Sequence, residues 1–151
     1  MNNRHIIPIC LAFIATPFSV FASSVVINEV MFDPLGSDSG YEWVELYNTG
    51  DEQADISGWE VYPDGIGYFT IPHGFLLGAK KFVVIHLKGS GSHSITDLYH
   101  TTTSSSNMGN TSGSVAIFRA GMETKKDRIK DFMQWGRSDR KSTRLNSSHR
   151  L

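Results

Sequence analysis

The 151-residue chain has room for one domain of ordinary size. Residues 23–138 carry nine Lys/Arg and fourteen Asp/Glu, a net charge of −5, and residues 25–64 hold ten of the carboxylates and no Lys or Arg. Because phosphate backbones repel such a chain, the balance excludes general nucleic-acid binding. With a single cysteine, Cys10, the chain cannot form an internal disulfide.

The first 22 residues have the order of a secretory signal. Arg4 and His5 give a weakly basic start, residues 6–21 are almost wholly apolar, and Val20-Phe21-Ala22 fits a cleavage site. A membrane anchor is the alternative, but spanning needs about 20 apolar residues, and this run is shorter and contains two prolines. We therefore expect removal of residues 1–22 and a secreted chain (extracellular, at the cell surface or periplasmic) without a membrane span.

Short β segments separated by turn signals follow. Residues 25–31 are rich in β-branched side chains and are followed by Asp33-Pro34, which predicts a strand and a turn. Residues 41–48 alternate between two faces, as a half-buried strand does. One face carries Trp43, Glu45 and Tyr47, and the other carries Val44 and Leu46.

The second half of the domain continues this pattern. Residues 56–62, 67–71, 114–119 and 128–135 are predicted strands, and residues 81–87, KFVVIHL, form the strongest one. Residues 88–113 lie between the predicted strands 81–87 and 114–119, and sixteen of them are Gly, Ser or Thr. This composition predicts a long loop or flexible insertion that contributes no side chains to the core. About seven short strands without a helix predict an all-β antiparallel sandwich.

Residues 137–151 are expected to be non-native. Residues 139–149, DRKSTRLNSSH, are polar and aperiodic, and they match the translation of a sequencing-library adapter over eleven consecutive codons. A natural basic tail is the alternative that composition alone would allow. We expect the natural sequence to stop near Ser138, where the gene itself could be cut short. The tail is therefore left out of the fold prediction.

Three segments together form a recognisable pattern: VINEV with DP at 26–34, EWVELYN at 42–48 and DISGW at 55–59. The pattern resembles the lamin-tail domain family, and FTIP at 69–72 and DF with WG at 131–136 extend the resemblance over residues 25–136. The resemblance implies an immunoglobulin-like β-sandwich without a catalytic centre, of the kind found in exported bacterial proteins. The motif positions are Asn28, Glu29, Glu42, Trp43, Glu45, Asn48, Gly58, Trp59, Trp135 and Gly136.

Structural roles explain most of these positions. The three tryptophans are expected to dominate the core, because each aromatic side chain buries about 150–250 Å². Gly58 allows a bend or a close backbone approach. Asn28 and Asn48 are expected to cap turns or to hydrogen-bond loop backbone.

The carboxylates allow a sharper hypothesis. If their strands pair, Glu29 and Glu45 converge on an aromatic-lined patch, and paired carboxylates serve acid–base chemistry or hard-metal binding. Calcium is the more sensible metal, with further oxygen ligands from Asp33, Asp38 or Glu42. Because no DxDxDG loop is present, solvated or hydrogen-bonded carboxylates are the main interpretation, and calcium held by Glu29, Asp33, Glu42 and Glu45 is the alternative. No other cofactor and no catalytic residue is expected.

The leading functional hypothesis is a non-catalytic binding or structural module. The chain has no HExxH, GxSxG or phosphate-loop motif, so we expect no enzyme in this fragment. Loops 33–41 and 88–113 are expected to contact a protein or cell-surface partner, since function concentrates on loops held by a scaffold.

Two rival hypotheses remain at this stage. One is carbohydrate or cell-wall binding through Tyr41, Tyr62, Tyr68 and Trp43, whose aromatic faces could stack on sugar rings. The other is an N-terminal accessory domain of a truncated extracellular hydrolase or nuclease, which the complete reading frame would reveal.

Overall fold

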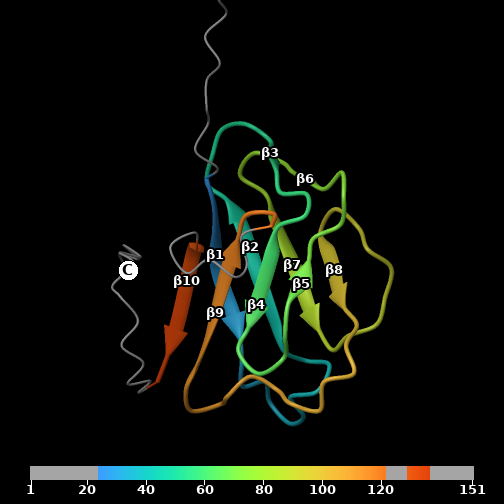
Figure 1. Cartoon of the computed structure of the whole chain (residues 1–151), viewed down its shortest axis with the longest axis vertical. Coiled ribbons are helices and arrows are strands. Elements are labelled where there is room, and N and C mark those ends of the chain that lie inside the picture. The colour runs from blue at the N-terminus through green and yellow to red at the C-terminus, as the bar shows by residue number, and fades with distance from the viewer. Residues whose placement is uncertain (1–23, 122–128, 137–151) are drawn as a thin grey trace, which may run out of the picture.

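The computed structural model of the chain describes residues 24–121 and 129–136. The expected signal segment and the expected non-native tail lie outside these residues. The described strands form two four-stranded sheets that stack face to face, and a two-stranded pair lies at the upper end in Figure 1. In this part of the chain no helix is long and apolar enough to cross a membrane.

The first sheet has the order β1-β2-β7-β8. Its first three strands pair antiparallel, whereas β8 pairs parallel to β7. A bulge interrupts β1 between Ile27 and Glu29. The strands are β1 (Val25–Met31), β2 (Trp43–Asn48), β7 (Phe82–Leu87) and β8 (Asp97–His100).

The second sheet has the order β10-β9-β4-β5 and is antiparallel throughout. It lies in front of the first sheet in Figure 1, with β10 beside β1. Its strands are β10 (Ile129–Trp135), β9 (Gly113–Phe118), β4 (Glu60–Pro63) and β5 (Phe69–Thr70), and the small pair consists of β3 (Ala54–Asp55) and β6 (Leu76–Leu77).

The all-β sandwich predicted from the sequence is confirmed, with more strands than expected. The described residues contain ten strands where about seven were predicted. The three additional strands are β3 and β6, which are too short to show a period in the sequence, and β8, which lies in the predicted loop. The parallel pairing of β8 with β7 departs from the predicted antiparallel arrangement.

The prediction for residues 88–113 was wrong in part. This Gly/Ser/Thr-rich segment contains β8, and it places Leu98 and Met108 in the core with 0% and 2% exposure. His100, expected in a mobile loop, is also buried. Two isolated apolar side chains give no local periodicity, but the open edge of β7 supplies the hydrogen-bond partners that order β8.

The core between the sheets is mainly aliphatic, so the expected dominance of tryptophan was also wrong. Only Trp59 is buried, at 6% exposure, while Trp43 and Trp135 are half-buried. Small branched side chains fill the gap between two closely packed sheets more completely than indole rings do. The core consists of Val25, Ile27, Val44, Leu46, Ile56, Trp59, Val61, Ile66, Phe69, Ile71, Leu77, Val83, Ile85, Leu87, Leu98, Met108, Val115 and Ile117.

Asp131 closes the side of the sandwich where β10 meets β1. Its Oδ2 accepts a hydrogen bond of 2.8 Å from the Ile27 N–H, and its Oδ1 accepts one of 2.9 Å from the Phe132 N–H. The carboxylate thereby satisfies a backbone donor at the outer edge of β1, where an unpaired N–H would invite another strand.

Candidate functional site

The two loops that the sequence singled out meet at the lower end of the sandwich in Figure 1. The Asn110 side-chain amide donates a 3.0 Å hydrogen bond to Asp33 Oδ1, and the Asn107 amide lies 3.5 Å from Asp38 Oδ2. We call this end, formed by residues 33–42 and 101–112, the lower loop end.

Glu42 lies at the centre of the lower loop end, directly before β2. Glu42 is 1% exposed, and its Oε1 accepts a 2.9 Å hydrogen bond from the Met108 N–H. Its Oε2 is buried without a hydrogen-bond partner among the described residues. One carboxylate therefore joins the two loops and keeps one oxygen unsatisfied.

Burial raises the pKa of the Glu42 carboxyl from 4.5 to about 7, because the ionised form loses its hydration. The nearby charge of Asp38 adds to this rise, whereas the Met108 N–H and the Lys88 ammonium oppose it. Near neutral pH the group therefore exchanges between its two protonation states.

Lys88, directly after β7, also bonds the lower loop end. Its backbone is left-handed, with φ of 55°, and its Nζ donates to Asn107 Oδ1 at 2.8 Å and to the Ser106 carbonyl at 3.3 Å. The lysine thus fixes the second loop while its charge lies close to Glu42.

Two large apolar side chains project from the first of these loops. Leu35 is fully exposed, at 107%, and Tyr41 is 66% exposed. Exposed apolar side chains on a braced loop are a feature of protein-binding surfaces, where aromatic anchors contribute most of the affinity.

The four residues suggested as calcium ligands do not meet in one place. Glu29 and Glu45 lie opposite each other on β1 and β2, and the Asn28 amide donates a 2.7 Å hydrogen bond to Glu45 Oε1. Asp33 and Glu42 belong to the lower loop end, where each accepts a hydrogen bond from the neighbouring loop. Within residues 24–121 and 129–136 no group of three His, Cys, Asp or Glu side chains could hold a metal ion.

The opposite, upper end of the sandwich is organised by Asn48, the last residue of β2. Its side chain is completely buried and uses every donor and acceptor that it has. It bonds loop backbone, as the sequence predicted, whereas Asn28 instead bonds a carboxylate across the strands. The Asn48 Oδ1 accepts from the Ser24 hydroxyl and the Gly50 N–H, and its Nδ2 donates to the carbonyls of Glu52, Leu77 and Gly78.

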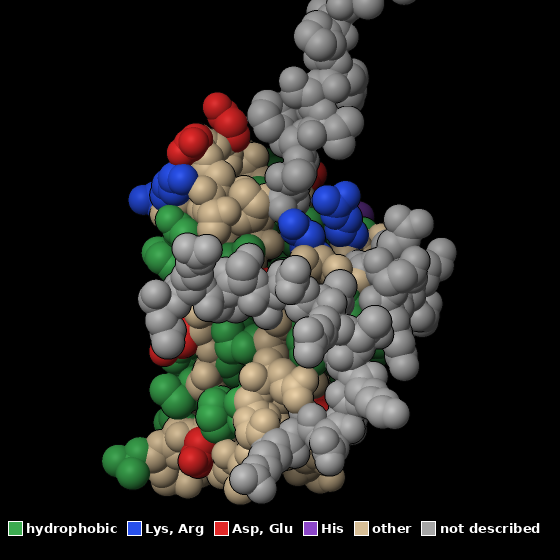
Figure 2. All heavy atoms as spheres, turned by 90° about the vertical axis from the view of Figure 1, so that its left-hand side faces the viewer, with side chains coloured by type: hydrophobic (Ala, Val, Ile, Leu, Met, Phe, Trp, Pro, Cys, Tyr) green, Lys and Arg blue, Asp and Glu red, His purple; other side chains and the backbone are tan. Residues whose placement is uncertain are grey.

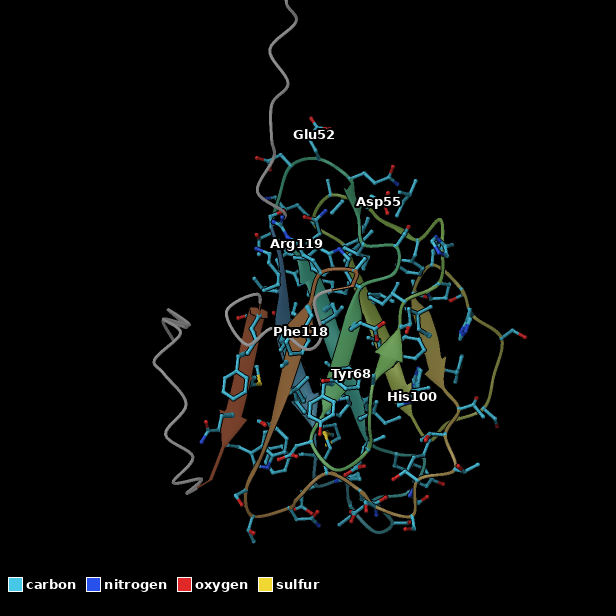
Figure 3. All side chains as sticks on the ribbon, in the orientation of Figure 1. Glu52, Asp55, Tyr68, His100, Phe118 and Arg119 are labelled. Carbon is cyan, nitrogen blue, oxygen red and sulfur yellow. The ribbon has the colours of Figure 1, made fainter. Side chains whose placement is uncertain are left out.

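Two of the four aromatic residues suggested for carbohydrate binding come together on the outer face of the second sheet. The rings of Tyr62 and Tyr68 have centroids 4.6 Å apart, and the Phe118 ring lies 6.3 Å from Tyr68. Figure 3 shows Tyr68 beside Phe118 on the face turned to the viewer. Tyr41 belongs to the lower loop end, and Trp43 lies on the outer face of the other sheet.

The remaining motif residues shape the backbone around these sites. Gly58 and Gly136 have positive φ angles of 69° and 71°, a conformation that other residues adopt only with strain. The Trp135 ring stacks on Phe32 at 4.5 Å, and its Nε1–H donates a 2.7 Å hydrogen bond to the Gly109 carbonyl. Trp135 therefore anchors the lower loop end from β10.

Sequence reasoning missed two groups that the structure brings forward. Met108 plugs the lower loop end, and its only signal is that it is the one large apolar side chain in residues 101–112. His86 Nε2 and Asp97 Oδ1 form a 2.8 Å hydrogen bond between β7 and β8. That pair could not be found without knowing that β8 is a strand.

The two stacked sheets, whose polar groups fix loops and strand edges, place the protein in the class of immunoglobulin-like β-sandwich modules. The sequence agrees with this class: the Lamin Tail Domain family matches residues 21–136, and the chain belongs to that family. A comparison with curated proteins gives no match.

Proposed function

We propose that this protein is an exported, non-catalytic binding module that recognises a protein partner through its lower loop end. The observation that carries the proposal is the joining of two distant loops through Glu42, with Leu35 and Tyr41 exposed on the first of these loops. Loops that are already braced lose little conformational entropy on binding, which favours affinity.

Site-specific crosslinking tests this proposal. A photoreactive side chain at position 35 is expected to capture one discrete protein from intact cells of the source, and Tyr41→Ala is expected to abolish the capture. The matched control is position 95, where Ile95 is 81% exposed on the β7–β8 connection. Equal capture from both positions, or capture unaffected by Tyr41→Ala, would contradict the lower loop end as the binding site.

Export is the second part of the proposal and is supported by the pattern of residues 1–22. Expression of the whole chain should yield mature protein outside the cytoplasm, beginning at Ser23 by mass spectrometry. Protein retained in the cytoplasm with Met1 in place would contradict it. The complete reading frame would show in addition whether the module accompanies a hydrolase or nuclease.

Carbohydrate binding is a second candidate function, which the ring pair of Tyr62 and Tyr68 favours. A pair of tilted, partly exposed rings on a sheet face offers stacking surfaces for neighbouring sugars. Retention on immobilised polysaccharide should then disappear in the variant Tyr62→Ala/Tyr68→Ala and persist in Tyr41→Ala. Absence of retention on a broad glycan panel would dismiss this candidate.

A further inference from the structure

We infer that the outer face of the first sheet binds a basic, extended protein segment with Arg side chains at alternate positions. This face uses residues other than those of the lower loop end, so the inference does not rest on the proposed function.

Aromatic side chains form two rows across this face. The alternating burial of β2 and β7 turns Trp43 and Tyr47, and Phe82 and His86, away from the core. In the upper row Tyr47 stacks on Phe82 with ring centroids 4.4 Å apart. In the lower row Trp43 lies opposite His86, and His86 stacks on Tyr99 of β8 at 4.8 Å. Stacked rings form a rigid surface that loses little entropy when a ligand covers it.

Carboxylates lie in the row between the two aromatic rows. Glu45 is opposite both Glu29 and Val84, and Val84 is opposite Asp97. Like charges directly opposite in a sheet are destabilising, and no described Lys or Arg forms an ion pair with Glu29 or Glu45. Glu45 accepts a hydrogen bond from the Asn28 amide, and Glu29 beside it adds a second carboxylate that a cationic ligand could pair with.

The strands of this face carry no Lys or Arg, and their one outward-facing basic group is His86, whose Nε2 lies 2.8 Å from Asp97 Oδ1. The same four strands contain three carboxylates. Of the neighbouring lysines, Lys80 pairs with Asp51 at 3.0 Å, Lys88 bonds the lower loop end, and Lys81 is exposed directly before β7. In Figure 2 the outer side of this sheet lies edge-on at the left border, and the Lys and Arg side chains in view lie near the upper end. The charge of this face complements a basic partner.

The spacing of the rows identifies an extended segment. Alternate residues of a strand are separated by about 7 Å, so the carboxylate row lies about 7 Å from each aromatic row. An extended peptide running along the strands presents its own alternate side chains at the same interval. Arg fits both kinds of row, because its planar guanidinium bonds carboxylates in a bidentate manner and stacks on aromatic rings.

Fluorescence anisotropy with a labelled peptide of four Arg-Ser repeats tests the inference on purified protein. Saturable binding is expected, with about threefold weaker binding of the matched Lys-Ser peptide, since an ammonium does not stack as a guanidinium does. Glu45→Gln and Phe82→Ala should each weaken the Arg-Ser peptide about three- to fivefold, as expected for one exposed charge pair or one cation–π contact.

Two controls separate this face from the rest of the protein. Glu52→Gln removes the same charge at the upper end, and Leu35→Ala removes an exposed apolar side chain at the lower loop end; both should leave the affinity unchanged. If Glu45→Gln and Glu52→Gln weakened the binding equally, attraction by the net charge of the protein would explain it. That result would overturn the inference. Absence of peptide binding, or binding of an uncharged hexasaccharide that Phe82→Ala abolishes, would also overturn it.

Discussion

A polar side chain is buried at each end of strand β2, but the two side chains differ in how fully they are hydrogen-bonded. At the upper end Asn48 is buried with all its hydrogen-bonding groups satisfied by neighbouring loops. At the lower end Glu42 is buried to the same degree, yet it has one accepted hydrogen bond and one unsatisfied oxygen. One end of the strand therefore holds a buried amide whose polar groups are all hydrogen-bonded. The other end holds a buried carboxylate with one unsatisfied oxygen, which is energetically unfavourable.

This difference indicates which end of the sandwich responds to pH through its buried polar side chain. A satisfied amide does not titrate, so the hydrogen bonds of Asn48 do not depend on the ionisation of its own side chain. The buried carboxyl at the lower end changes its protonation near neutral pH. Because Glu42 bonds Met108 in the second loop, the free energy of the lower loop end depends on pH through the ionisation of this carboxyl.

The largest expected effect is the loss of the upper-end network. Asn48→Ala removes the partners of buried carbonyls, and because each unsatisfied buried group costs about 1–3 kcal/mol, the free energy of unfolding should fall by about 3 kcal/mol or more. Urea denaturation measures this change. The matched variant Asn110→Ala removes one exposed hydrogen bond at the lower end and should cost about 1 kcal/mol or less. Equal losses in both variants would contradict the larger contribution of the upper-end network.

The second effect is a dependence of stability on pH that comes from Glu42. The folded-state pKa of about 7 lies above the unfolded value of 4.5, so the folded protein binds the extra proton between these values. The free energy of unfolding should therefore fall as pH rises from about 4.5 to about 7 and stay flat above, by at most about 3 kcal/mol. Glu42→Gln cannot ionise and should be more stable than the natural protein at pH 8.

Urea denaturation of both proteins between pH 5 and pH 8 measures this difference. His100, whose pKa burial lowers, makes the free energy of unfolding rise with pH up to its unfolded pKa of 6.5, but it does so equally in both proteins. The difference between the two curves therefore isolates Glu42. A constant difference over this range would show that Glu42 does not titrate there.

The smallest expected effects come from the charges around Glu42. Asp38→Asn removes a like charge and should lower the pKa of Glu42, whereas Lys88→Gln removes a favourable charge and should raise it. Carbon-13 NMR titration of the Glu42 carboxyl would detect the two shifts in opposite directions. Asp51→Asn, at the upper end, is the control and should leave the titration unchanged. Shifts in the same direction would contradict the proposed electrostatic environment.

The upper end was partly predictable because its signals are local. The turn residues after Asn48 and the alternation of residues 41–48 are short-range features, and the observed strand and its backbone hydrogen bonds agree with them. The lamin-tail pattern likewise consists of short segments, so family and fold class could be predicted before any contact was known.

The lower end was less predictable because its contacts join residues far apart in the chain. The sequence indicated that loops 33–41 and 88–113 were candidates, but nothing in it indicates that Met108 reaches Glu42 across 66 residues. The strand β8 was missed for the same reason, since its order depends on the edge of β7 and not on its own composition.

The sequence by itself determined the strand periodicity, the family and the excess of carboxylates, since each of these is a property of neighbouring residues or of a sum over them. Only the tertiary structure decided which carboxylate is buried, which carboxylates face each other and which aromatic rings stack. Burial and cross-strand register arise when distant segments pack, and the desolvation that raises the pKa of Glu42 exists only in that packed state.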